Sequence, residues 1–91
     1  MDFQQLTTAL LMGEPPRSEP FMQGMAAVLR NRIEKTLVVS PYTDGTAEAD
    51  AFFAGRMRGH SEFRNALIEA DNNRERAIQH LQKLVNARRV A

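Results

Sequence analysis

The fold of this chain is decided by residues 47–70, AEADAFFAGRMRGHSEFRNALIEA. The stretch contains no proline, and Thr46 in front of it is a residue type that caps helix N-termini with its side-chain oxygen. Glu48 and Asp50 place negative charge near the positive end of the helix dipole. The sequence therefore predicts one long helix over this stretch, and the rest of the fold is organised around it.

One row of residues along this helix recurs at alternating spacings of four and three. The row is Phe52, Arg56, Gly59, Phe63, Ala66 and Ala70, with Gly55 beside it. Each glycine inside a helix costs about 1 kcal/mol relative to alanine, so the two glycines indicate a close neighbour that needs the space. That neighbour is either another helix of the same chain or a helix of a partner, and a kink at the glycines is a third interpretation. As a candidate partner interface we name Phe52, Gly55, Arg56, Gly59 and Phe63.

A second apolar set, Phe53, Met57 and Ile68, lies on a different side of the same helix. A helix that is apolar on two sides must be covered on both. Three other short helices are too few to cover both sides. We therefore expect the protein to form a homo-oligomer or to dock on a larger assembly.

The segments before the long helix predict two shorter helices. Residues 1–12 form the first, capped by Asp2, and residues 13–20 form a proline-rich linker in which prolines interrupt helical hydrogen bonding. The second begins near Pro20 or Phe21, after the cap Ser18, and carries an apolar stripe. Residues 37–39 are expected to be its frayed end.

The last helix follows a break at residues 71–73. Asn72, with Glu75 three residues later, predicts a capping box at its start. Residues 21–91 then make up a helical core, and residues 1–91 make up a single domain. The predicted fold class is all-α, a small bundle of three to four helices with one long central helix.

Composition excludes several classes of function. The chain has 91 residues, a net charge of +1 and no cysteine, which excludes disulfides, thiolate nucleophiles and cysteine-ligated zinc. No stretch approaches the roughly 20 apolar residues that span a bilayer, so no membrane span is expected. His60 and His80 fall on different predicted helices without ligand spacing, and no serine lies in a Gly-x-Ser-x-Gly turn. We expect a non-enzymatic protein with no metal and no cofactor.

Basic side chains gather on the last two predicted helices. Candidate contacts to nucleic acid are Arg64, Arg74, Arg76, Lys83, Arg88 and Arg89. Such a group can neutralise phosphates. Acidic residues interleave with it, however, and Arg58 can pair with Glu62 one turn on, which favours a solvated, salt-bridged surface. Binding to nucleic acid is therefore the alternative hypothesis.

Ser40-Pro-Tyr, followed by Ala51-Phe-Phe-Ala-Gly-Arg-Met-Arg-Gly59, resembles a pattern found in small tailed-bacteriophage proteins. In that family a helix and a short linker precede an Ala/Phe-rich helix with a Gly-Arg core, and the match spans roughly residues 27–70. The resemblance implies a small virion structural or ejection-associated component, located in the virion or the host cytoplasm. It designates no catalytic residue and carries over only Gly55, Arg56 and Gly59 as interface candidates. An inhibitor that docks on a host enzyme would share the phage context and stays an alternative.

Overall fold

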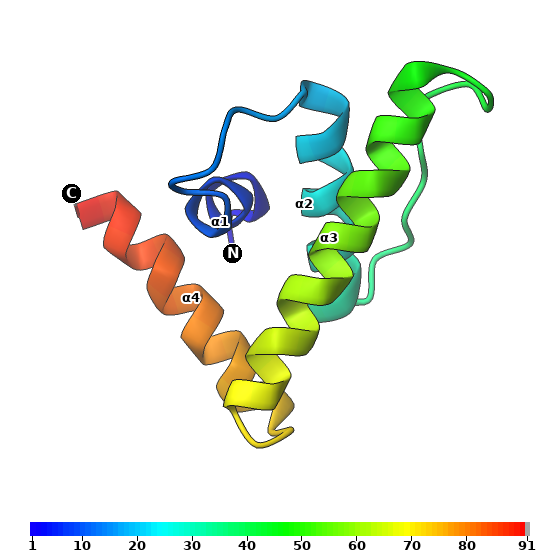
Figure 1. Cartoon of the computed structure of the whole chain (residues 1–91). Coiled ribbons are helices and arrows are strands. Elements are labelled where there is room, and N and C mark those ends of the chain that lie inside the picture. The colour runs from blue at the N-terminus through cyan, green and yellow to red at the C-terminus, as the bar shows by residue number, and fades with distance from the viewer. Residues whose placement is uncertain (91) are drawn as a thin grey trace.

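Four α-helices make up the computed structural model, which describes residues 1–90 and the side chains of residues 1–88 (Figure 1). They are α1 (Phe3–Leu10), α2 (Glu19–Glu34), α3 (Ala47–Glu69) and α4 (Arg74–Val90). The described residues contain no strand. The predicted all-α class with one long central helix is confirmed.

The first three helices begin at the predicted caps. The side chains of Asp2, Ser18 and Thr46 each accept a hydrogen bond from the backbone N–H three residues later. Helix α2 starts at Glu19, inside the segment expected to be linker, because Pro20 fits the first turn of a helix, where its missing N–H has no partner to lose.

Two other helix boundaries differ from the prediction. The N-cap of α4 is Asn73, whose Oδ1 accepts from the N–H of Arg76 at 3.0 Å, and not Asn72. Asn72 instead has a φ of 63°, a left-handed conformation that asparagine tolerates better than most residues. Helix α2 stops sharply because Lys35 is also left-handed, with a φ of 60°. Residues 37–39 are therefore an irregular connection and not a frayed helix end.

Helices α2 and α3 form the central pair, and they run in the same direction because residues 35–46 lead back from the end of α2 to the level of its start (Figure 1). After the turn at residues 70–73, α4 diverges from α3, and the two helices form a V. Helix α1, seen end-on in Figure 1, lies in the opening of this V and packs against both α2 and α4. The N-terminal helix is thus docked on its own chain.

The hydrophobic core receives side chains from every helix. Its most deeply buried members include Leu6, Met25, Leu29, Phe63, Leu81 and Val85. Thr7 is also buried, and its hydroxyl donates to the carbonyl oxygen of Phe3 at 2.8 Å, so its polar group is satisfied. No helix within residues 1–90 is long and apolar enough to cross a membrane.

Candidate interaction surface

The glycines of α3 lie where α2 crosses it. A Cβ atom at Gly55 would overlap the backbone carbonyl oxygen of Phe21. One at Gly59 would overlap the Val28 side chain and lie 3.0 Å from the Met25 carbonyl oxygen. The missing side chains therefore allow two helix backbones of the same chain to approach each other.

A third glycine, Gly24 on α2, completes this contact and was not predicted. A Cβ atom there would overlap the backbone carbonyl oxygen of Phe52. Its position between Phe21 and Met25, both buried, is the signal that could have identified it. The crossing thus uses glycines from both helices. We call Gly24, Gly55 and Gly59 the glycine seam.

The residues expected to form a partner interface therefore face α2. Phe52 and Phe63 are each only 2% exposed, and the glycines between them are buried. Arg56 is half-buried, its Nε atom is enclosed without a hydrogen-bond partner, and its guanidinium carbon lies 5.9 Å from the centre of the Phe53 ring. The close neighbour indicated by the two glycines is helix α2 of the same chain.

Residues 35–46, which connect α2 and α3, contact both helices through Tyr42 beside this seam. The hydroxyl of Tyr42 donates to Oε1 of Gln23 at 2.6 Å. Its ring meets that of Phe52 edge-on, with the ring centres 6.1 Å apart. The aromatic end of the seam is consequently covered by the chain's own loop.

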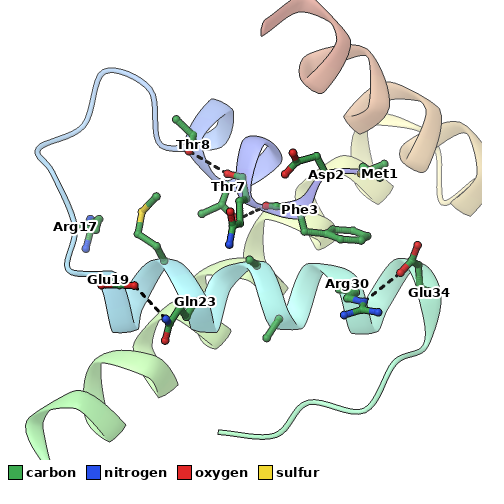
Figure 2. A pocket seen from close by; sticks show the side chains of 14 residues that line it. Met1, Asp2, Phe3, Thr7, Thr8, Arg17, Glu19, Gln23, Arg30 and Glu34 are labelled. Carbon is green, nitrogen blue, oxygen red and sulfur yellow. Dashed lines mark hydrogen bonds and ion pairs between the residues drawn. The ribbon is translucent and has the colours of Figure 1, made fainter. Parts of the chain in front are cut away.

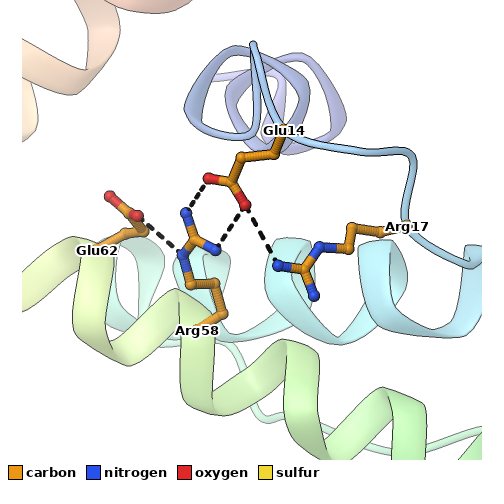
Figure 3. Close-up of polar contacts among 4 residues, drawn as sticks. All are labelled: Glu14, Arg17, Arg58 and Glu62. Atoms are coloured by element: carbon orange, nitrogen blue, oxygen red, sulfur yellow. Dashed lines mark hydrogen bonds and ion pairs between the residues drawn. The ribbon is translucent and has the colours of Figure 1, made fainter.

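On another side of α3, Arg58 fastens the proline-rich linker to the helix (Figure 3). Its two terminal nitrogens donate to both carboxylate oxygens of Glu14, one of them at 3.0 Å, and its Nε donates to Glu62 at 2.9 Å. Arg17 reaches the same Glu14 at 3.2 Å. Such a two-pronged contact between a guanidinium and a carboxylate is among the stronger polar interactions in proteins.

This network shifts the ionisation of its members. The hydrogen bond from Arg58 is the main reason that the pKa of Glu14 falls from 4.5 to about 2, with Arg17 adding to the effect. The same contact raises the pKa of Arg58 above its ordinary range. Glu14 is thus charged at every physiological pH, and the linker stays pinned to α3.

The outer face of α3 carries large apolar side chains that nothing in the described chain covers. Phe53 is 58% exposed, Met57 is 52% exposed and Ile68 is 60% exposed. These are the residues whose spacing predicted a second apolar side. Because large exposed apolar groups gathered on one face mark interaction sites, this outer face is the candidate interaction surface.

The polar residues of the outer face are also exposed. Asp50, Ser61 and Arg64 lie on the same side of the helix as Phe53 and Met57, within an arc of about 80° at 3.6 residues per turn. Neither the carboxylate of Asp50 nor the guanidinium of Arg64 forms an ion pair with a described residue. Along the outer face, Asp50 therefore precedes the apolar Phe53 and Met57, and Arg64 follows them, with Ile68 beyond it.

His60 lies at the border between the outer face and α2. Its Nδ1 is 3.1 Å from a terminal nitrogen of Arg32, whose guanidinium carbon lies 4.7 Å from the centre of the Phe63 ring. Burial, and then the charges of Arg32 and Arg56, lower the pKa of His60 below its ordinary value. The neutral ring can accept the hydrogen bond from Arg32, so His60 serves to hold α2 against α3.

The candidate contacts to nucleic acid do not form one surface. Arg74 donates to the carbonyl oxygens of Arg32 and Ile33 at 2.8 and 3.0 Å, and so satisfies the C-terminal end of α2. The other exposed members, besides Arg74 itself, are Arg64, Arg76, Lys83 and Arg88. The side chain of Arg89 lies outside the described residues.

Two of these cations share a hollow with acidic groups. Arg76 and Lys83 line a space of about 390 Å³ between α4 and the end of α3, together with Glu69 and Asp71. His80 lies on the same rim, 3.9 Å from Glu69. The carboxylates reduce the attraction of this hollow for phosphate.

An open groove of about 850 Å³ lies between α1 and α2 (Figure 2). Several of its polar side chains bond to one another or to their own helix: Arg30 donates to Glu34 at 3.2 Å, and the Thr8 hydroxyl donates to a backbone carbonyl at 3.0 Å. The groove therefore offers a ligand few unpaired donors that converge on one point. No group of three His, Asp or Glu residues that could hold a metal ion occurs within the part of the chain that the structure describes.

Comparisons of this chain with protein-family models, with curated proteins and with solved structures found no match.

Proposed function

We propose that this is a non-enzymatic helical interaction protein that acts by packing the outer face of α3 against another protein surface. The observation that carries the proposal is the exposure of Phe53, Met57 and Ile68 on one side of a helix whose opposite side is already buried. Burying such groups releases about 25 cal/mol for each Å² of apolar surface, which gives a partner a direct gain in free energy.

The biological setting that we propose is a bacteriophage particle, in which the protein is a small virion structural or ejection-associated component. The support is the resemblance of residues 40–59 to the family of small tailed-bacteriophage proteins. A role by packing also agrees with the groove between α1 and α2, where Gln23 bonds to Glu19 and Arg30 bonds to Glu34. Detection of the chain by mass spectrometry in purified phage particles tests this setting.

The interaction itself is tested by charge placed on the outer face. Phe53→Lys and Met57→Lys should each abolish association of the protein with the particle, while Asn65→Lys should leave it unchanged. Asn65 is an exposed residue of the same helix that lies beside the outer face, so it is a matched control. Circular dichroism verifies that all three variants keep the helical fold. Association that survives both substitutions on the outer face would refute the proposal.

Nucleic-acid binding is the second candidate, and it rests on Arg76 and Lys83. Both are exposed on one side of α4, seven residues and thus about two turns apart, and neither forms an ion pair with a described residue. Binding of labelled DNA and RNA is measured at low and at physiological salt, where phosphate contacts give a steep loss of affinity with salt. If it exists, Lys83→Glu should weaken it, and absence of binding at low salt would remove this candidate.

A further inference from the structure

The charged residues on the outer face of α3 are placed symmetrically about Met57. Asp50 and Arg64 each lie seven residues from Met57, one toward each end of the helix. They are about 21 Å apart along the axis at a rise of about 1.5 Å per residue. Both are exposed, and neither forms an ion pair with a described residue. The face therefore carries opposite charges at equal distances from an apolar centre.

We propose that the occupant of the outer face is a second copy of this chain, with the two α3 helices packed side by side in opposite directions around a two-fold axis at Met57. This rests on the proposed function, since it takes the outer face as the interaction surface. A surface that meets itself across a two-fold axis must be self-complementary. Turning the face end to end brings Asp50 of each copy beside Arg64 of the other, so the ion pair forms twice.

The apolar groups fit the same register. With Met57 of one copy against Met57 of the other, the Phe53 ring lies opposite Ser61, an exposed small residue that leaves room for it. Ile68, at the far end of the face, comes level with the start of the other copy's α3. Large side chains thus meet small ones along the contact, which is how helices interlock.

A parallel pairing has no such complementarity. It would place Asp50 beside Asp50 and Arg64 beside Arg64, and like charges set against each other oppose association. The macrodipoles of two parallel helices would also repel, while those of antiparallel helices attract. The charges of Asp50 and Arg64 therefore select the antiparallel arrangement.

Sedimentation equilibrium on the full chain tests the proposal. The wild-type protein should show a concentration-dependent monomer–dimer equilibrium, and Asp50→Lys and Arg64→Glu should each weaken the dimer at least about tenfold, because each change sets two like pairs against one another. The double variant D50K/R64E should recover dimer affinity to within about threefold of wild type, because its charges are complementary again. Asn65→Lys is the control, and circular dichroism confirms that every variant is folded.

The outcomes separate this inference from the proposed function. A wild-type chain that stays monomeric at millimolar concentration, or a double variant as weak as the single ones, would overturn the antiparallel dimer. If Phe53→Lys and Met57→Lys still prevented association with phage particles, the outer face would remain an interaction surface whose occupant is a different protein. Recovery in D50K/R64E would support the dimer whatever the result with particles.

Discussion

The two sides of α3 differ in how their apolar surface is covered: one is packed against α2 and the other is exposed. On the seam side, Gly55 and Gly59 remove side chains so that the backbone of α2 comes close. On the outer side, Phe53 and Met57 are more than half exposed. The first side gains stability from close packing, while the second leaves apolar surface in water.

The contrast separates a side of α3 that packs within the chain from a side that is available to a partner. The seam is shaped by backbone atoms on both sides, so it fits only one arrangement of α2 and α3. The outer face consists of side chains that can adapt to a neighbour, and methionine in particular adjusts to irregular surfaces. A side occupied in this way by the chain's own backbone is unsuited to a partner, whereas the exposed side is suited to one.

The largest effect is expected from Gly55→Leu. A leucine side chain cannot share space with the carbonyl group of Phe21, so α2 and α3 must separate. Small domains have only about 5–15 kcal/mol of stability, and we expect this change to remove most of it. Urea unfolding followed by circular dichroism measures the loss.

Its matched control is Ala54→Leu at the neighbouring position. Ala54 is exposed, so the larger side chain enters water and the free energy of unfolding should change by no more than about 0.5 kcal/mol. Equal effects of the two substitutions would contradict the assignment of the seam.

A smaller effect should separate the glycines from one another. In Gly24→Ala the new methyl group meets the backbone of Phe52, whereas in Gly59→Ala its nearest neighbour is a terminal methyl group of Val28. Overpacking costs about 1–3 kcal/mol, and alanine returns about 1 kcal/mol of helix propensity. We expect a loss of about 2 kcal/mol for Gly24→Ala and less than about 1 kcal/mol for Gly59→Ala in urea unfolding. The reverse order would show that the backbone contact is not the tighter one.

Local signals in the sequence were sufficient for much of this fold. Thr46 and the absence of proline located α3 correctly from Ala47 onward, and Asp2 and Ser18 located two further caps. The start of α4 was predicted one residue too early, because Asn72 and Asn73 are equally good caps in sequence and only the turn geometry distinguishes them.

Residue spacing could not predict contacts between residues that are far apart in the sequence. The pairing of Arg58 with Glu62 followed from their spacing of four, but the stronger contact with Glu14 joins residues 44 positions apart. The spacing of Gly55 and Gly59 indicated a close neighbour without specifying which helix supplies it. Arg74 likewise resembled the other exposed cations in sequence, although it satisfies the end of α2.

The ion pairs of Glu14 belong to neither the glycine seam nor the outer face of α3. They should make the free energy of unfolding depend on pH, with an effect of intermediate size. The folded state lowers the pKa of Glu14 from 4.5 to about 2, so its contribution to stability is complete above pH 4.5 and is lost as the pH falls toward 2. Glu14→Gln should therefore be less stable than wild type at pH 7 and equally stable near pH 2. Urea unfolding across this range measures the difference, and a difference that does not depend on pH would contradict the ion pair.

Only a small effect on folding is expected from Phe53→Ser on the outer face. The side chain is mostly in water, so its removal should cost at most about 1 kcal/mol, which covers its contact with the Arg56 guanidinium. Urea unfolding at low protein concentration, where monomers dominate, measures this value. The cost should grow as the concentration rises, because the dimer that wild type gains is then lost in the variant. A large cost at low concentration would instead mean that Phe53 belongs to the fold of the single chain, and the difference between the two sides of α3 would disappear.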